Sequence, residues 1–260
     1  MKKIFTICCL IITFYATAVF PDGKHFARSY MANTMEKSEL ELEFLNTARI
    51  GKMSGFYYNY KPQFEVEYGV TDDLTASFYF NFEQTTVSGN SFENENFGFE
   101  SNSLEFRYRL SEIGENFIDP ALYFEFEYGG KIIAYEPKII LSKNYNNWNG
   151  VINISSEFER DIVNSSQKTN IELTGGVIYD VSSGFGFGIE FMNHRILNDI
   201  FGGQEGQATF LGPTFNYFGD EFNFTINIMR QISGSPISKN GMELLHHEVY
   251  EVKTILEIEL

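Results

Sequence analysis

The chain has 260 residues, of which 35 are acidic and 19 are basic, so its formal net charge is −16 at pH 7. A surface this acidic repels the phosphates of nucleic acids, and we expect no nucleic acid among its partners. The two cysteines, Cys8 and Cys9, lie near the N-terminus, so the rest of the chain has no thiol for a disulfide, a zinc cluster or a nucleophile. No other motif indicates a cofactor or a metal ion, and we expect neither.

The N-terminal residues have the pattern of a signal peptide. Lys2 and Lys3 precede an apolar run over residues 4–15, and Ala16-Thr17-Ala18 has the small-x-small pattern of a cleavage site. The apolar run is shorter than the roughly 20 residues that a membrane-spanning helix needs. We therefore predict a signal peptide over residues 1–18, which is removed on export.

Strict alternation of apolar and polar residues begins near residue 38 and decides the predicted architecture. Successive side chains of a strand point to opposite faces, whereas a helix would scatter such a pattern around its surface. The first segment alternates Leu40, Leu42 and Phe44 with Glu39, Glu41 and Glu43. The alternation returns, in chain order, in residues 64–68, 74–82, 104–110, 122–128, 133–141, 148–158, 171–179, 185–191, 209–217, 222–228 and 250–260. We count twelve strands, with ten and fourteen as the alternatives.

The connections between these segments differ in length. Compact turns are expected at residues 69–73, 111–119, 142–147, 180–184 and 218–221, and long loops at residues 84–97, 194–206 and 231–245. Bacterial outer-membrane barrels have short periplasmic turns and longer outer loops, with both termini on the periplasmic side. Several strands also carry an aromatic residue just before a compact turn, where a girdle of interfacial aromatics belongs, namely Tyr68, Tyr108, Tyr179 and Tyr217.

We therefore predict an all-β fold, a closed antiparallel transmembrane β-barrel over residues 37–260. No stretch after the signal peptide has 18 consecutive apolar residues, so only a closed barrel could span a membrane. Residues 19–36 are interpreted as an N-terminal periplasmic segment. The alternative is a secreted β-sandwich, but its strands would be shorter than the roughly ten-residue strands expected here.

Four short motifs resemble those of an uncharacterised family of proteobacterial outer-membrane barrels. They are Arg49-x-Gly51-Lys52-x-x-Gly55, Glu67-Tyr68-Gly69-Val70-Thr71-Asp72-x-Leu74, Leu211-Gly212-Pro213 and His247-Glu248. Their order and spacing match along nearly the whole mature chain. The Tyr-Gly-Val-Thr-Asp turn is also distantly similar to the transporter-like barrels associated with phenol-degradation operons.

The resemblance implies a protein of the bacterial outer membrane, in contact with its lipids and assembled there by the barrel-assembly machinery. It assigns no substrate and no catalytic residue. Barrels of this kind usually finish on an aromatic residue that the assembly machinery recognises, whereas this chain finishes on Leu260.

The inward-facing side of the predicted strands is acidic. Most glutamates of the alternating segments take this side, together with the few basic residues Arg107, Arg109, Lys138 and Lys253. Because charged side chains set the field inside a pore, the pattern indicates a channel that passes small polar or cationic solutes. The alternative is a closed structural or adhesive barrel, in which the charges pair across strands.

The candidate selectivity residues lie on three neighbouring strands and are Glu105, Arg107, Glu125, Glu136 and Lys138. A two-residue Gly129-Gly130 loop predicts that Tyr128 pairs with Lys131. In this register Glu125 faces Ala134, Tyr123 faces Glu136 and Ala121 faces Lys138, so that the two glutamates are diagonal neighbours.

An enzyme is the less favoured hypothesis. Hydrolases among outer-membrane barrels use a histidine and a serine, typically as His-x-Ser, and none of the four histidines begins such a motif. His194 and His247 both lie near predicted outer strand ends, where a lipid-modifying site could be assembled in space. We nevertheless expect the protein not to be an enzyme.

Overall fold

The computed structural model describes residues 24–260 apart from residues 54, 89–92, 95, 183 and 201. The predicted signal peptide over residues 1–18 therefore lies outside the described residues. The strands are β1 Leu40–Ile50, β2 Phe56–Thr71, β3 Leu74–Ser88, β4 Glu93–Asn94, β5 Gly98–Arg109, β6 Asp119–Gly129, β7 Ile132–Tyr145, β8 Trp148–Asp161, β9 Gln167–Ser182, β10 Phe185–Leu197, β11 Gln204–Phe218, β12 Asn223–Ser235 and β13 Tyr250–Glu259. No helix in the described ranges is long and apolar enough to cross a membrane.

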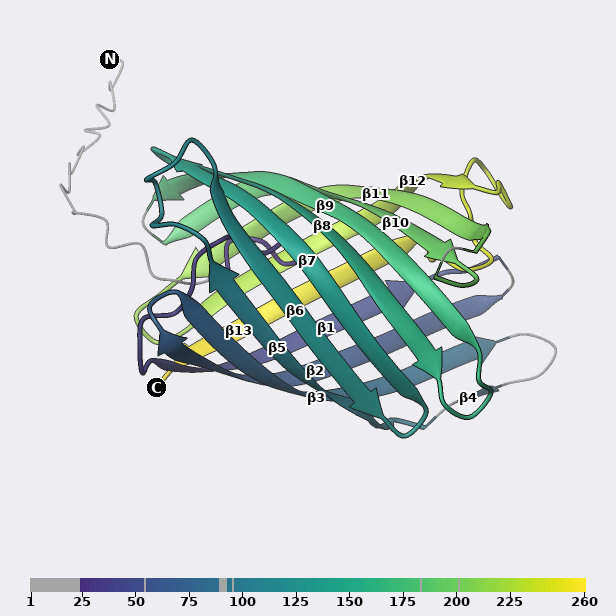
Figure 1. Cartoon of the computed structure of the whole chain (residues 1–260). Helices are drawn as coiled ribbons and strands as arrows, with labels where there is room; N and C mark the ends of the chain where they lie inside the picture. The colour runs from purple at the N-terminus through teal and green to yellow at the C-terminus, as the bar shows by residue number, and fades with distance from the viewer. Residues whose placement is uncertain (1–23, 54, 89–92, 95, 183, 201) are drawn as a thin grey trace, which may run out of the picture.

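Twelve of these strands close into a barrel (Figure 1). Each pairs antiparallel with the next along the chain, and β1 pairs with β13 over ten residue pairs, which closes the ring. The two-residue β4 pairs only with the end of β3 and lies outside the ring. Closure gives each of the twelve strands of the ring two partners, so the ring has no open edge. The predicted closed antiparallel barrel of twelve strands is confirmed.

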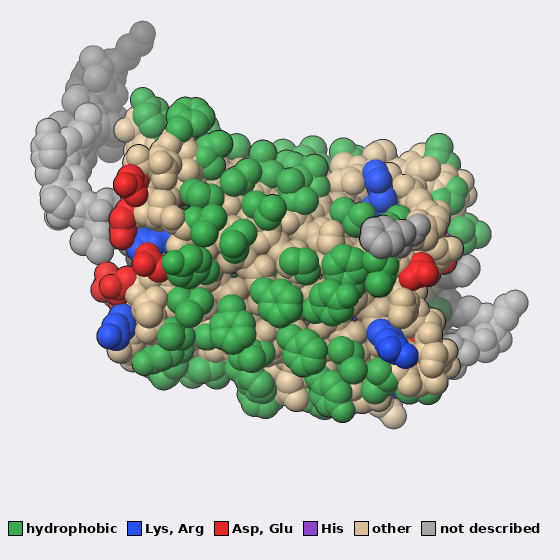
Figure 2. Space-filling model, in the orientation of Figure 1, with side chains coloured by type: hydrophobic (Ala, Val, Ile, Leu, Met, Phe, Trp, Pro, Cys, Tyr) green, Lys and Arg blue, Asp and Glu red, His purple; other side chains and the backbone are tan. Residues whose placement is uncertain are grey.

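The two faces of the barrel differ as the alternation predicted. Outward phenylalanines such as Phe80, Phe106 and Phe124 are 44%, 41% and 44% exposed, and apolar side chains form a broad band across the face of the barrel that Figure 2 shows. On the same strands, inward residues such as Glu105 and Ser77 are at most 1% exposed. The expected lipid-facing and inward-facing sides are therefore correct.

The two ends of the barrel are distinguished by their connections. One, here called the turn end, carries the short links between β2 and β3, β7 and β8, β9 and β10, and β11 and β12, and the C-terminus lies there too (Figure 1). The other, called the loop end, carries the 14-residue connection between β12 and β13. Tyr68, Tyr108, Tyr179 and Tyr217 lie close to the turns, where the interfacial aromatics were predicted.

The predicted register of β6 with β7 is wrong by two residues. Tyr128 pairs with Ile133 rather than with Lys131, so Glu125 lies directly opposite Glu136, and Tyr123 lies opposite Lys138. Four residues, Gly129 to Ile132, therefore separate the last paired residues of the two strands, instead of the predicted two. A shift of two residues keeps every side chain on its predicted face, because the period of a strand is two.

Substitution Phe80→Arg tests the outward band. Phe80 lies mid-strand on β3 opposite Phe64 and contacts the ring of Phe78 at 5.0 Å. A cation there would have to enter the hydrocarbon, so we expect the free energy of unfolding in lipid vesicles to fall by about 2–4 kcal/mol. Phe56→Arg at the loop end of β2 is the matched control, and its cost should be near the interfacial value of about 0–1 kcal/mol. Equal costs at both positions would contradict the proposed depth of the band.

Candidate functional site

Residues 24–37, here called the lumen segment, run through the inside of the barrel near its turn end. The sequence predicts a periplasmic segment over residues 19–36, of which residues 19–23 lie outside the described residues. In the described part, Phe26, Ala27 and Ala32 are at most 3% exposed inside the barrel wall, so this part lies in the lumen instead. Polar groups of the wall bind its backbone along its length. Tyr30 N donates to Asn153 Oδ1 at 2.6 Å, and Asn153 Nδ2 donates back to Tyr30 O at 2.9 Å.

Glu190 on β10 is the main anchor of the lumen segment. Its carboxylate accepts hydrogen bonds from the backbone N–H groups of Ala27, Arg28 and Ser29 at 3.1, 3.0 and 3.1 Å, and from the Thr214 hydroxyl at 2.7 Å. Hydrogen bonds to a charged acceptor are stronger than those between neutral groups. Glu190 is fully buried, so this binding also supplies the polar partners that its charge requires.

Gly176, which pairs with Glu190 on the neighbouring strand, makes room for the segment. A Cβ at Gly176 would lie 2.8 Å from a ring carbon of Phe26. The glycine therefore permits a close approach that any other residue would block.

The lumen segment places a lysine among buried carboxylates at the turn end. Lys24 Nζ lies 2.5 Å from Glu43, 3.3 Å from Glu65 and 3.5 Å from Glu67. Burial opposes the charged amine, but these glutamates outweigh it and raise the pKa of Lys24 well above its usual value. Lys24 therefore stays charged and neutralises part of the cluster.

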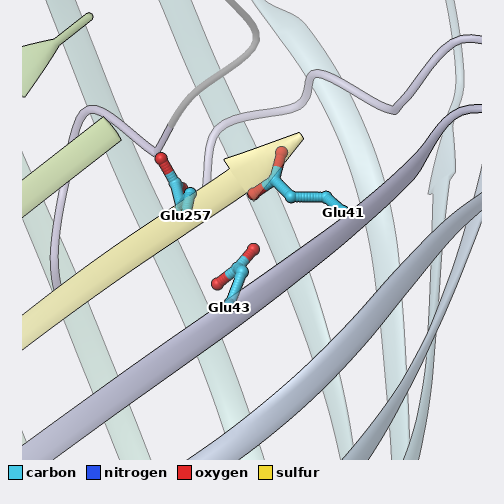
Figure 3. A group of neighbouring side chains, drawn as sticks. All are labelled: Glu41, Glu43 and Glu257. Atoms are coloured by element: carbon cyan, nitrogen blue, oxygen red, sulfur yellow. The ribbon is translucent and has the colours of Figure 1, made fainter. Parts of the chain in front are cut away.

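The same end holds a group of three glutamates from the seam between β1 and β13. Glu41, Glu43 and Glu257 turn their carboxyl groups toward one another (Figure 3), with ligating oxygens within 4.8 Å. All three are buried. Glu257 also accepts a hydrogen bond from Lys24 N at 2.8 Å, so the lumen segment contacts this group as well.

A cavity of about 490 Å³ occupies the barrel interior on the loop-end side of the lumen segment. The candidate residues Glu125, Glu136 and Lys138 line it. Lys138 Nζ lies 3.3 Å from Glu136 and 4.0 Å from the centre of the Tyr123 ring, while Tyr123 donates to Glu125 at 2.6 Å. The two glutamates face each other across the strand pair, and Lys138 offsets part of their repulsion.

Glu105 and Arg107 lie deeper than the other three candidates. Glu105 is fully buried and accepts a hydrogen bond from Tyr79 at 2.5 Å, and Arg107 forms an ion pair with Glu67. Arg107 also lines a smaller cavity of about 70 Å³ at the turn end, together with Lys24 and Glu257. The five candidates therefore occupy two levels of the lumen.

The motif residues at the loop end hold the connection between β12 and β13 against β1. Arg49 Nε lies 3.7 Å from Glu248 and 3.0 Å from Glu251. Gly51 has a φ of 83° and accepts a backbone hydrogen bond from Val249 at 2.9 Å. His247, in the same connection, is buried. Lys52 Nζ lies 4.6 Å from the centre of the Tyr57 ring, and Gly55 has a φ of 71°.

The motif residues at the turn end hold the exit of the lumen segment. A Cβ at Gly69 would lie 1.8 Å from Glu36 O, and Gly69 O accepts a hydrogen bond from Ser38 N at 2.8 Å. Asp72 accepts from Lys37 N through its side chain and from the Thr34 hydroxyl through its backbone. The remaining motif positions have local roles. Thr71 Oγ1 accepts a hydrogen bond from Asp73 N, and the Tyr68 side chain faces outward. The backbone of Gly212 packs closely against Ile228 O, and Pro213 pairs with Ile189 on the neighbouring strand.

Sequence reasoning missed the lumen segment and therefore its residues Lys24, Arg28 and Tyr30. They lie outside the alternating region, and no spacing rule connects them with β10 or β13. One available signal was the presence of three basic residues, Lys24, Arg28 and Lys37, just before an acidic barrel. A second signal was Gly176, which has no side chain at an inward-facing position of β9 opposite Glu190.

His194 and His247 come together as the hydrolase hypothesis required, with His247 Nε2 3.1 Å from His194 Nδ1. They line the inner cavity, however, and not the outer wall where lipid lies. Among the described residues, neither imidazole is hydrogen-bonded to a serine or threonine hydroxyl. The geometry gives no support to a lipid-modifying site.

The model of the family of unknown function DUF6662 matches residues 19–131 and 134–259, so the chain belongs to this family. No curated protein gives a significant match. The structure is similar to the COG4313 outer membrane channel from Pseudomonas putida F1, with a TM-score of 0.69, 12% identity, and coverage of 88% of this chain and 98% of that one. It also resembles the NanC porin, with a TM-score of 0.54, 15% identity, and coverage of 84% of this chain and 100% of that one. For the KdgM porin the TM-score is 0.54 and the identity 10%, with coverage of 85% of this chain and 99% of that one. The fold is that of outer-membrane channels and porins.

Substitution Glu190→Ala tests the anchor of the lumen segment. It removes the acceptor of three backbone hydrogen bonds, and a hydrogen bond to a charged group contributes about 1.5–3 kcal/mol. We expect amide hydrogen exchange at residues 27–29 to accelerate by roughly tenfold or more while the barrel strands stay protected. Glu157→Ala, another inward glutamate, is the control and should leave exchange at these amides unchanged. Unaltered protection in Glu190→Ala would show that the segment is held by other contacts.

Proposed function

We propose that this family member is an outer-membrane channel that passes small polar or cationic solutes through an acidic lumen. The main observation behind this proposal is a cavity of about 490 Å³ inside the closed twelve-strand barrel. Charged side chains line this cavity. A cavity lined by charged side chains inside a closed barrel suits a pathway for polar solutes. The predicted signal peptide and the likeness to outer-membrane channels support the location.

The proposed route passes the lumen segment. The larger cavity lies on its loop-end side and the cavity of about 70 Å³ on its turn-end side. Tyr30 lines both, so we infer that it stands at the constriction between them. If the turn end faces the periplasm, as in other bacterial barrels, solutes enter through the wide cavity and leave through the narrow one.

The charges of the two cavities favour cations to different degrees. Among the described residues, nine glutamates and seven lysines or arginines line the cavity of about 490 Å³, and four glutamates and two lysines or arginines line the cavity of about 70 Å³. Each cavity therefore has a formal excess of two negative charges, and the smaller cavity holds this excess in a much smaller volume. Cation preference should therefore arise mainly near the constriction and be adjusted by the pair Glu125 and Glu136 above it.

A closed structural or adhesive barrel is the second candidate. The observation in its favour is the lumen segment itself, which fills much of the turn end with buried side chains. Conductance decides between the two, because a closed barrel passes no current.

The double change Glu125→Gln and Glu136→Gln should reduce cation preference in a planar bilayer under a salt gradient. It removes two facing negative charges from the cavity wall and leaves Lys138 without its carboxylate. Glu115→Gln with Glu221→Gln, on exposed turns, makes the same change in net charge and should leave the reversal potential unaltered. Unchanged selectivity in a conducting double variant would remove these residues from the selectivity site, whereas a non-conducting wild type would remove the channel itself.

Replacing the ring at the constriction should widen the route. In Tyr30→Ala the side chain shared by both cavities is lost, while the backbone hydrogen bonds to Asn153 are kept. We expect single-channel conductance to rise. Phe117→Ala, at a side chain that is 90% exposed on a turn, serves as the control and should conduct like the wild type. A conductance that does not change in Tyr30→Ala places the constriction elsewhere.

A further inference from the structure

Three titratable side chains form a continuous chain at the loop end of the cavity. Glu243 and His247 belong to the connection between β12 and β13, and His194 lies near the loop end of β10. Glu243 Oε2 lies 2.5 Å from His247 Nδ1, and His247 Nε2 lies 3.1 Å from His194 Nδ1. Fifty-three residues separate the two histidines in sequence, so their contact is a product of the fold.

The hydrogen bond to Glu243 fixes which nitrogen of His247 carries its proton. A carboxylate only accepts, so Nδ1 of His247 donates to it, and Nε2 of the neutral ring presents a lone pair to His194. A ligating histidine typically has this arrangement, with its second nitrogen held by a carboxylate.

The separation of the two facing nitrogens also suits a shared ion. Two imidazole nitrogens at 2.0–2.1 Å from a tetrahedral zinc ion lie about 3.3 Å apart. The observed 3.1 Å is close to this value, and the two rings are nearly perpendicular, at 84°. With its proton on Nε2 instead of Nδ1, His194 presents a lone pair on the side of His247, and a tilt of the two rings directs both lone pairs to one ion.

The loop that carries His247 is fixed before any ligand binds. Glu243 accepts from the backbone N–H groups of Leu245, His246 and His247. Gln231 on β12 exchanges hydrogen bonds with Glu243 and also donates to Glu248 O at 2.9 Å. A ligand on such a support loses little conformational freedom on binding.

Both histidines line the large cavity, so a dissolved ion has a path to them. His247 is 2% exposed, and His194 is half-buried on the cavity side. Further coordination positions would be filled by water from the cavity. Two imidazoles select the borderline transition ions Zn²⁺, Ni²⁺ and Cu²⁺ over Ca²⁺ and Mg²⁺, which prefer oxygen.

We propose that His194 and His247 form a binding site for a divalent transition-metal ion in the loop-end cavity, with Glu243 orienting His247. The sequence-based expectation of no metal rested on the lack of a local motif, and these ligands do not form one. Binding at this site does not depend on whether the barrel conducts, so the proposal and the channel function can fail separately.

Calorimetric titration of the untagged, refolded barrel in detergent with ZnCl₂ tests the proposal. We expect one equivalent to bind, His194→Ala and His247→Ala each to abolish that binding, and Glu243→Gln to weaken it by about 10–100-fold. His25→Gln removes a histidine from the lumen segment at the turn end and should bind as the wild type does. Each variant is first checked for heat-modifiable gel migration, which reports the folded barrel.

A second measurement keeps the proposal testable if an alanine variant does not fold. The electron paramagnetic resonance spectrum of the wild type with one equivalent of Cu²⁺ should show hyperfine coupling to two imidazole nitrogens. No saturable binding by the folded wild type, binding unchanged in both histidine variants, or a copper spectrum without nitrogen coupling would each overturn the proposal. In those cases the three side chains form only a structural hydrogen-bond chain.

Discussion

The structure depends on one constraint, which is that a chain crossing hydrocarbon must pair every backbone polar group within itself. Closure of β1 against β13 meets this constraint without leaving an edge. Once the sheet is closed, the alternation of the strands sorts side chains into an outer apolar band and an inner polar wall. Most charges of the strands are thereby directed into one confined space.

Confinement removes water from these charged groups, and the side chains of the barrel wall do not supply all the partners that the groups need. Buried carboxylates such as Glu43, Glu65 and Glu190 need opposite charges or hydrogen-bond donors to compensate for the water that they lose. The lumen segment supplies both, with the amine of Lys24 for the turn-end cluster and three backbone N–H groups for Glu190. The segment is therefore part of the folded barrel's charge balance as well as an element of the proposed pathway.

The residues that were predicted to be family motifs lie where irregular chain is attached to the regular barrel. Gly69 and Asp72 hold the exit of the lumen segment, and Arg49 and Gly51 hold the connection before β13. These contacts position two irregular segments that line the lumen, since Tyr30 of the lumen segment and His247 of the connection before β13 both line the larger cavity.

The sequence by itself determined the fold class, the twelve strands, the face of each side chain and the end at which the turns lie. It could do so because these features follow from local alternation and turn composition, as in the run from Leu40 to Phe44. Only the tertiary structure decided the pairing of Glu125 with Glu136, since a slip of two residues leaves the alternation unchanged. It alone placed Lys24 and Arg28 inside the barrel and brought His194 to His247, because those contacts join residues far apart in sequence, through loops and a segment that have no periodic pattern.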